Sequence, residues 1–115
     1  MPPTLADRVW HILEAIQDIE RALSNKTYDE FVADRLLRAA VERLVEIVCE
    51  ATRRIPDEVK RTEPAIAWQK VIDFGNRLRH AYHVVDAAIV WQIVRNDLPP
   101  MKAFAQRIIA ESESR

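Results

Sequence analysis

The chain has 115 residues, a formal net charge of −1 at pH 7, one glycine and one cysteine. This length predicts a single domain, residues 1–115, that is large enough to bury its own core. A net charge near zero argues against a surface that binds nucleic acid without specificity, although a small local basic site remains compatible with it. The lone Cys49 excludes an internal disulfide and fits a reducing cytoplasm.

Neither a targeting segment nor a membrane span is expected. The first residues do not combine a positively charged region with an apolar one, as a signal peptide does. No stretch approaches the roughly 20 apolar residues of a membrane-spanning helix. We therefore expect a cytoplasmic protein without a membrane partner. The scarcity of glycine, with abundant Ala, Leu, Ile, Glu and Arg, predicts helices over nearly the whole chain.

The first predicted helix covers about residues 4–24. Thr4 is its expected N-cap, with Asp7 as the acidic partner of a capping box. Apolar residues spaced three and four apart line one face of this helix: Leu5, Val9, Ile12, Ile16, Ile19 and Leu23. Such spacing is typical of an amphipathic helix that packs on a core.

The second predicted helix runs from about residue 28 to Arg54, and Pro56 ends it. Its apolar positions repeat at a heptad-like spacing: Leu37, Val41, Leu44, Val48 and Ala51. Further apolar residues on either side of this stripe suggest that the helix contacts more than one neighbour.

The rest of the chain predicts shorter elements. Residues 55–65 are expected to form a loop with one helical turn, and a third helix follows over residues 65–82. A fourth helix begins at Asp86, its expected N-cap, and ends before Pro99, and a short fifth helix covers residues 100–110. Short connections between these segments predict an all-α, antiparallel bundle of four to five helices.

The third helix has three distinct faces when its residues are placed about 100° apart. An apolar face is predicted to be core: Val71, Phe74, Leu78, Ala81 and Val85. One polar face carries Gly75, Arg79 and Tyr82, and the other carries Asn76, His80 and His83. The only glycine of the chain thus stands within a helix, where glycine costs roughly 1 kcal/mol relative to alanine.

These two polar faces carry the groups needed to cleave RNA without a metal ion. Imidazole accepts or donates a proton near neutral pH. A guanidinium holds a phosphate and stabilises developing negative charge. The ribose 2′-hydroxyl attacks the adjacent phosphate, so the protein need only move protons and stabilise the phosphorane. Each residue also has an ordinary structural explanation, as a solvated charge, a surface amide or an aromatic ring at a helix end.

The same segments carry a resemblance to a known family. The chain resembles the HepT-like toxins of the HEPN superfamily, small all-helical ribonucleases paired with a minimal nucleotidyltransferase antitoxin. The segments "DRVWHILEAIQDIE" and "YDEFVADRLLRAAVERLVEIVCEA" are similar to the family's first two helices. The segment "IAWQKVIDFGNRLRHAYHVVDAAIVWQIVRNDLPPMK" is similar to its signature region. That signature is Arg, four to six residues, His, one residue and Tyr, usually with Asn directly after the Arg.

The resemblance implies roles for the matching positions. Asn76, His80 and Tyr82 match the family's Asn, His and Tyr. By this match, His80 is the catalytic imidazole, and Tyr82 is where an MntA-like nucleotidyltransferase attaches AMP and silences the toxin. The resemblance also implies an HEPN-like fold and a homodimer whose two motifs face one cleft. It implies a type VII toxin–antitoxin system that acts on RNA, either tRNA or mRNA.

The chain departs from the signature at one position, because Gly75 stands where the family has its arginine. One hypothesis is that Gly75 clears room for Arg79 or Arg77 to hold the phosphate, while Asn76 orients the phosphate or the imidazole. A second is that Gly75 lets two helices cross closely at a dimer interface, and both can hold together. A third is that the lost arginine marks a weakened nuclease that survives as an interaction module.

The same residues and the tryptophans raise two other functions, metal binding and stacking on RNA bases. A metal site at His80 and His83 is not expected, because no third ligand stands at a matching position, and no cofactor is predicted. Trp10, Trp68 and Trp91 suggest stacking on RNA bases. Their spread over three helices instead favours packing in the core or at an interface.

Overall fold

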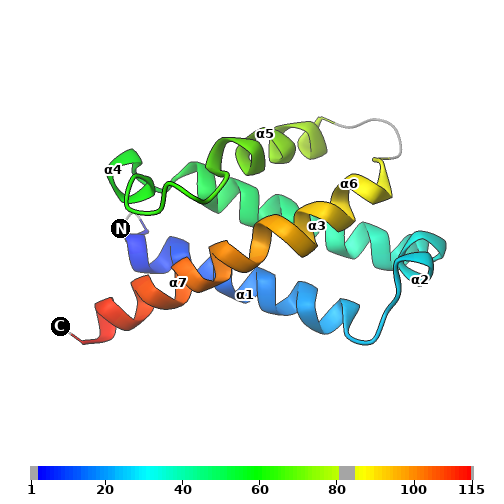
Figure 1. The fold of residues 1–115 in the computed structure, drawn as a ribbon, viewed down its shortest axis with the longest axis horizontal. Helices are drawn as coiled ribbons and strands as arrows, with labels where there is room; N and C mark the ends of the chain where they lie inside the picture. Colours follow the sequence, from blue (N-terminus) through cyan, green and yellow to red (C-terminus); the bar gives the residue numbers. More distant parts are fainter. Residues whose placement is uncertain (1–2, 81–84, 115) are drawn as a thin grey trace.

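The computed structural model describes residues 3–80 and 85–114, which form helices and no strand, so the predicted all-α class is confirmed (Figure 1). The long helices are α1 (Leu5–Leu23), α3 (Arg35–Arg53), α5 (Trp68–Arg79) and α7 (Leu98–Glu113). The short ones are α2 (Tyr28–Ala33), α4 (Asp57–Lys60) and α6 (Ala87–Gln92). A π-helical turn, η1 (Ile93–Asp97), joins α6 to α7. The helix α4 is the single turn predicted between α3 and α5.

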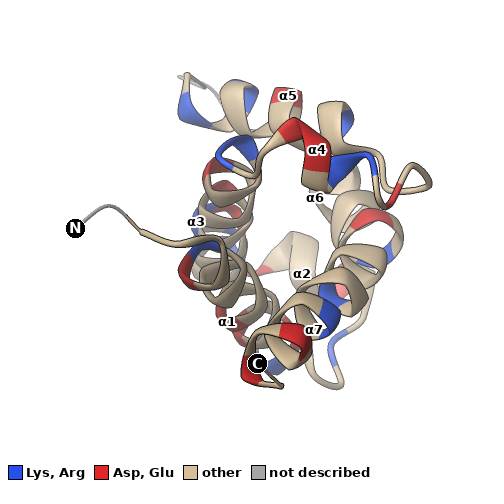
Figure 2. Cartoon of the chain, turned by 90° about the vertical axis from the view of Figure 1, so that its left-hand side faces the viewer, with Lys and Arg blue, Asp and Glu red and all other residues tan. Residues whose placement is uncertain are grey.

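The long helices form an antiparallel bundle. Helix α1 packs against both α3 and α7, and α5 lies across α3 (Figure 1). Seen end on, these four helices surround one core (Figure 2). The largest fully buried side chains include Phe31, Phe104, Ile12, Ile19, Ile93, Leu98 and Met101. No helix within the described ranges is long and apolar enough to cross a lipid bilayer.

Helix α1 begins and packs as the sequence predicts. The Thr4 hydroxyl accepts a hydrogen bond from the Asp7 backbone N–H at 3.1 Å, and the Asp7 carboxylate accepts one from Thr4 N–H at 2.9 Å. This capping box satisfies two backbone donors that the helix itself leaves unpaired. The backbone hydrogen bond from Thr4 lowers the pKa of Asp7. The predicted apolar face is buried at Val9, Ile12, Ile16 and Ile19.

The prediction of one continuous helix over residues 28–54 is wrong, because the chain breaks at Asp34. This residue has an extended backbone (φ −100°, ψ 97°), and its carboxylate accepts a hydrogen bond from Leu37 N–H at 3.0 Å. Asp34 therefore ends α2 and caps α3, as a short acidic side chain is suited to do. The separate α2 buries Phe31, whose ring centroid lies 5.4 Å from that of Trp91.

The predicted break before Pro99 is also wrong. Asp86 caps α6 as expected, since its carboxylate accepts a hydrogen bond from Ala88 N–H at 2.9 Å. However, α6, η1 and α7 then follow one another without a gap. Pro99 and Pro100 fall in the first turn of α7, where proline is tolerated because the missing N–H has little to bond. The wider π-helical turn directly precedes them.

The third predicted helix, residues 65–82, begins later than expected, at Trp68. The indole Nε1 of Trp68 donates hydrogen bonds to the backbone oxygens of Lys60 and Glu63, each at 3.1 Å. Its ring also meets the Phe104 ring edge to face, with centroids 5.0 Å apart. The indole thus fixes the turns after α4 and sets the point at which α5 starts.

The Asp34 cap generates a stability prediction. Asp34→Ala should lower the free energy of unfolding by about 1 kcal/mol, because a backbone N–H of α3 loses its acceptor. Urea denaturation followed by circular dichroism measures this change. Asp34→Asn is the matched control, since asparagine caps helices about as well as aspartate. Equal stability of the alanine and asparagine proteins would contradict the capping role.

Candidate functional site

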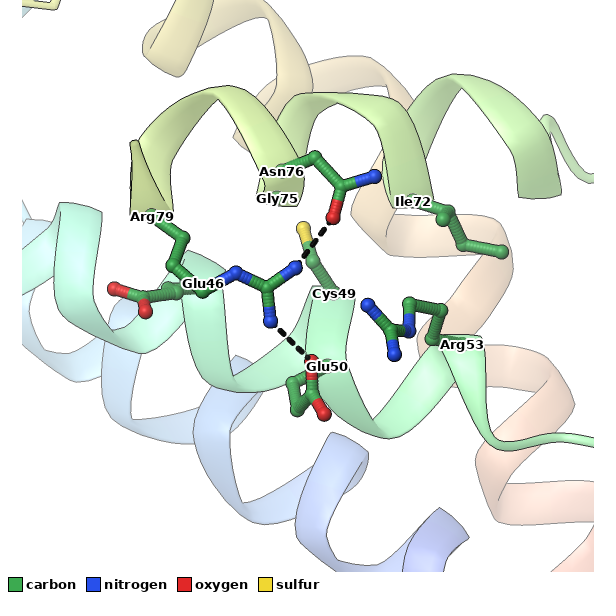
Figure 3. A pocket seen from close by; sticks show the side chains of 8 residues that line it. All are labelled: Glu46, Cys49, Glu50, Arg53, Ile72, Gly75, Asn76 and Arg79. Atoms are coloured by element: carbon green, nitrogen blue, oxygen red, sulfur yellow. Dashed lines mark hydrogen bonds and ion pairs between the residues drawn. The ribbon is translucent and has the colours of Figure 1, made fainter. Parts of the chain in front are cut away.

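The candidate site lies where the C-terminal part of α5 crosses α3 (Figure 3). Gly75, Asn76 and Arg79 of α5 line one small pocket at this crossing. The other residues that line it are Ile72 of α5 and Glu46, Cys49, Glu50 and Arg53 of α3. Arg77 is exposed and does not line this pocket. The structure therefore brings together three of the predicted site residues and leaves Arg77 apart from them.

Gly75 is buried against α3. A Cβ atom added at Gly75 would lie 2.2 Å from the Cβ of Cys49 and 3.1 Å from its Sγ. Carbon atoms that are not bonded do not approach so closely, so the backbone of α5 can reach α3 here only with glycine at position 75. The close crossing predicted at Gly75 therefore lies within one chain, between α3 and α5, rather than between two subunits.

Cys49 is core, as predicted, and it fills the space beside Gly75. Burial raises the pKa of the Cys49 thiol to about 12, so it is uncharged at neutral pH and unsuited to act as a nucleophile. The arginine of the family signature cannot occupy position 75 unless α5 moves away from α3. Gly75 consequently serves the packing of the two helices, and the hypothesis that it also clears room for Arg79 stays a prediction.

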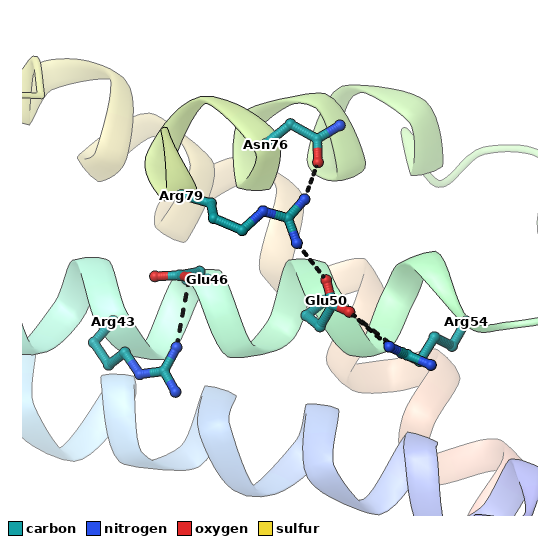
Figure 4. Close-up of polar contacts among 6 residues, drawn as sticks. All are labelled: Arg43, Glu46, Glu50, Arg54, Asn76 and Arg79. Carbon is teal, nitrogen blue, oxygen red and sulfur yellow. Dashed lines mark hydrogen bonds and ion pairs between the residues drawn. The ribbon is translucent and has the colours of Figure 1, made fainter. Parts of the chain in front are cut away.

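Arg79 bridges the two helices (Figure 4). Its Nη2 donates a hydrogen bond to Asn76 Oδ1 at 2.5 Å, and its Nη1 pairs with Glu50 Oε2 at 3.2 Å. The other oxygen of Glu50 pairs with Arg54 Nη2 at 3.1 Å. The Arg79 side chain is still 38% exposed, so a ligand from solvent can reach its guanidinium. That Arg79 replaces the missing signature arginine stays a prediction, and in this structure its guanidinium is paired with Asn76 and Glu50.

Glu50 sets the electrostatics of this bridge. Burial alone raises its pKa, but the hydrogen bond from Arg54 and the charges of Arg53, Arg54 and Arg79 outweigh that effect. The net result is a pKa below the ordinary value for glutamate, so Glu50 is ionised at neutral pH. A phosphate that binds Arg79 must therefore compete with the Glu50 carboxylate.

His80 ends α5. Its backbone N–H donates to the Asn76 carbonyl at 3.2 Å, and its φ of −106° and ψ of 13° mark it as the C-cap. The residue is exposed, which leaves its imidazole open to a substrate. The predicted helix was expected to continue to Tyr82, but Tyr82 and His83 lie outside the described residues. The roles predicted for them stay predictions.

The acidic partner of Arg79, Glu50, has no signal in the sequence that links it to Arg79. Glu50 and Arg54 stand four residues apart on α3, a spacing that predicts an ion pair on one helix. No comparable signal links Glu50 to Arg79, which lies 29 residues away. Within residues 3–80 and 85–114, no group of three His, Cys, Asp or Glu side chains is placed to hold a metal ion.

The three tryptophans differ in role. Trp68 and Trp91 pack against aromatic rings of the core, as predicted. The Trp91 ring also lies under the guanidinium of Arg95, with 5.3 Å between the Arg95 Cζ and the ring centroid. Trp10 is 50% exposed on α1, so it is not a core residue of this chain.

The contact between Gly75 and Cys49 predicts a specific coupling. Gly75→Ala should lower the free energy of unfolding by about 1–3 kcal/mol, because its added methyl overlaps the Cys49 Cβ. In a Cys49→Gly protein, which is itself destabilised by a glycine within α3, Gly75→Ala should cost much less than in the wild type, since the overlapping atom is removed. A double-mutant cycle in urea measures the coupling energy.

Cys49→Ala provides the matched control for that cycle, because alanine keeps the Cβ that causes the overlap. It should reduce the cost of Gly75→Ala much less than Cys49→Gly does. A stable Gly75→Ala protein that shows no coupling to position 49 would mean that the two helices do not need to approach so closely.

The buried thiol predicts a pH dependence of stability. Unfolded cysteine ionises near pH 8.5, whereas folded Cys49 ionises at about 12. Its contribution to stability is thus fully present below about pH 8.5 and is lost as the pH rises toward 12. Between pH 8 and pH 10, the wild type should lose about 2 kcal/mol more unfolding free energy than Cys49→Ala. Equal losses, measured by urea denaturation, would contradict a buried thiol.

Comparison with known proteins identifies the family. The family model described as "Ribonuclease HepT-like" matches residues 12–108. The chain is 33% identical over 102 residues to "Probable ribonuclease HepT" of Thermococcus cleftensis, covering 89% of this chain and 93% of that protein. It is 32% identical over 94 residues to "Putative RNase MJ1380" of Methanocaldococcus jannaschii, covering 82% and 86% of the two chains.

A third relative combines this region with another named activity. "Gamma-glutamylcyclotransferase and putative RNase MJ0434" of Methanocaldococcus jannaschii is 34% identical over 101 residues, covering 88% of this chain and 46% of that protein. No solved structure matches the chain significantly. The family match confirms the resemblance and, with the helical bundle, the HEPN-like fold. The chain belongs to the HepT-like ribonuclease family.

Proposed function

We propose that this protein is a metal-independent endoribonuclease and the toxin of a type VII, HepT/MntA-like toxin–antitoxin pair. The observation that carries the proposal is the Asn76–Arg79 pair, held beside the exposed His80 at the end of α5. These are an amide, a guanidinium and an imidazole within five consecutive residues of a chain that belongs to a ribonuclease family.

The proposed reaction uses the RNA's own nucleophile. The ribose 2′-hydroxyl attacks the adjacent phosphorus, and the bond to the 5′ oxygen of the next nucleotide breaks. The products are a 2′,3′-cyclic phosphate and a 5′-hydroxyl end. His80 accepts the proton of the 2′-hydroxyl as general base or donates a proton to the leaving oxygen as general acid. Two facing copies of His80 in a homodimer supply both roles.

Arg79 stabilises the negative charge that builds up on the phosphorane oxygens, and Asn76 orients the phosphate or the imidazole. Arg79 must exchange Glu50 for the phosphate to do so. This exchange is feasible because both side chains are partly exposed, and exposed ion pairs contribute only about 0–1 kcal/mol. Arg77 is the less favoured source of the phosphate contact, because it does not line the pocket of Asn76 and Arg79.

We propose that the cytoplasmic antitoxin partner, a minimal nucleotidyltransferase, silences this nuclease by attaching AMP to Tyr82. The support is the match of Tyr82 to the family signature, two residues after His80. The attached phosphate adds negative charge two residues after His80 in the chain, and negative charge disfavours the binding of RNA phosphates. No cofactor takes part in the proposed cleavage.

Two observations favour a second function. The arginine of the signature is absent, and the guanidinium of Arg79 is bound by Glu50. A catalytically weakened HEPN dimer that acts as a protein-interaction module has both features. The cleavage assay below separates these two proposals.

The first test incubates the unmodified protein with total RNA in EDTA, beside His80→Ala. The wild type should cleave RNA and leave 2′,3′-cyclic phosphate ends, whereas His80→Ala should not. Cleavage that requires an added divalent metal would overturn the metal-independent mechanism. No cleavage by a folded, unmodified dimer would leave the interaction module as the function.

The second test asks which arginine holds the phosphate. Arg79→Ala should lower the cleavage rate about 10²–10³-fold, as expected when a group that stabilises the transition state is lost. Arg77→Ala is the matched control, one turn or less away on the same helix, and should cleave at nearly the wild-type rate. Single-turnover cleavage of a labelled RNA measures both. The reverse ranking of the two variants would assign the phosphate contact to Arg77.

A further inference from the structure

A second cavity opens beside the candidate site. It has a volume of about 340 Å³ and lies between α1 and the C-terminal half of α3. Its lining includes Arg8 and His11 of α1, Arg43 of α3, Arg54 directly after α3, and Arg79 of α5. We refer to this cavity as the α1–α3 groove. The arginine that belongs to the candidate site therefore also lines the groove.

The α1–α3 groove is a local positive region in a chain whose net charge is −1. Its lining contains four arginines against two glutamates, Glu46 and Glu50. A concave surface with excess charge of one sign attracts ions of the other sign. Ile47 and Ala51 add an apolar part to the lining. A ligand with anionic groups joined to flat apolar groups matches this combination, and single-stranded RNA has both.

The arginines are held weakly enough to exchange partners. Arg43 lies 3.5 Å from Glu46, and Arg54 and Arg79 share Glu50 (Figure 4). These side chains are partly exposed, and such ion pairs contribute about 0–1 kcal/mol. Two carboxylates thus form ion pairs with three arginines. No ion pair to Arg8 is found in the part of the chain that the structure describes. The groove keeps positive charge available for phosphates.

The groove is also long enough for more than one phosphate. Arg43 and Arg54 lie about three helical turns apart on α3, or roughly 16 Å. Arg79 stands at one side of this path, directly before His80 in the chain. A strand whose scissile phosphate lies at Arg79 therefore has a positively charged path along α3 toward the start of α1.

We infer that the α1–α3 groove binds the RNA strand next to the scissile phosphate, with Arg8 and Arg43 in contact with its backbone. This inference rests on the proposed function, because it takes the cleavage site to be at Arg79 and His80. The groove contributes affinity and holds the strand in register. The contacts are to phosphates, so they do not select a base sequence.

The test measures binding apart from cleavage. A fluorescent single-stranded oligouridylate is titrated with His80→Ala protein, and anisotropy gives Kd at several salt concentrations. Arg8→Ala and Arg43→Ala, each in that background, should weaken binding on the order of fivefold. Each should also reduce the slope of log K against log salt by about 0.7. Glu46→Gln should tighten binding, because it frees Arg43 and removes a negative charge.

Arg21→Ala is the matched control, since Arg21 is an exposed arginine near the opposite end of α1 from Arg8. It should leave Kd and the salt slope unchanged. Thermal unfolding checks that every variant is folded. Opposite effects of Arg43→Ala and Glu46→Gln on affinity support the groove, because loss of a purely structural contact does not produce both.

Two outcomes would overturn the inference. If the Arg8→Ala and Arg43→Ala proteins bind RNA as tightly as the Arg21→Ala control, the groove is not an RNA path. That result is expected if the groove instead binds an acidic segment of a protein. If Arg21→Ala weakens RNA binding as much as the groove variants do, the effect comes from the overall charge of the protein and not from the groove. If wild type cleaves but the groove variants bind normally, only the inference fails. If wild type does not cleave but groove variants lose binding, only the proposed cleavage fails.

Discussion

The contact between Gly75 and Cys49 determines how the candidate site is built. It brings the backbone of α5 so close to α3 that no side chain fits between them at position 75. This approach places Arg79 within reach of Glu50 across the two helices and beside Asn76 on its own helix. The same approach excludes an arginine at position 75. The packing of α5 on α3 is therefore compatible with glycine at position 75 and not with arginine, and Arg79 stands about one helical turn later.

The arrangement of charges around the candidate site follows from that packing of α5 on α3. Two glutamates of α3, Glu46 and Glu50, pair with three arginines near the site: Arg43, Arg54 and Arg79. These ion pairs hold the three arginines in place in the free protein. A phosphate must compete with Glu50 for Arg79, because Glu50 is ionised at neutral pH and pairs with Arg79. The proposed function and the proposed groove both depend on the ease of this exchange.

Much of the fold could be predicted from local chemistry. Thr4 and Asp86 are caps whose partners lie within three residues, so their sequence signals are complete. The break at Asp34 was not predicted, although the partner of this cap, Leu37, also lies three residues away, because the apolar pattern continues on both sides of Asp34. Pro99 and Pro100 predict a helix end, but they fall in the first turn of α7, where proline is tolerated, and η1 directly precedes them.

The site could be predicted in part. Asn76, Arg79 and His80 were identified as candidates from residue types at helical spacing and from the family signature. The role of Gly75 could not be predicted, because it depends on Cys49, which lies on another helix. Glu50 was missed for the same reason. Contacts between two helices depend on how the helices cross, and the spacing of residues within one helix does not predict that crossing.

The most direct test of this account is a crystal structure of the His80→Ala protein with a short RNA that carries 2′-O-methyl groups and cannot be cleaved. The account predicts that a backbone phosphate lies on the Arg79 guanidinium, that Glu50 has released Arg79, and that α5 still contacts Cys49 at Gly75. A phosphate bound at Arg77, with Arg79 still paired to Glu50, would contradict it.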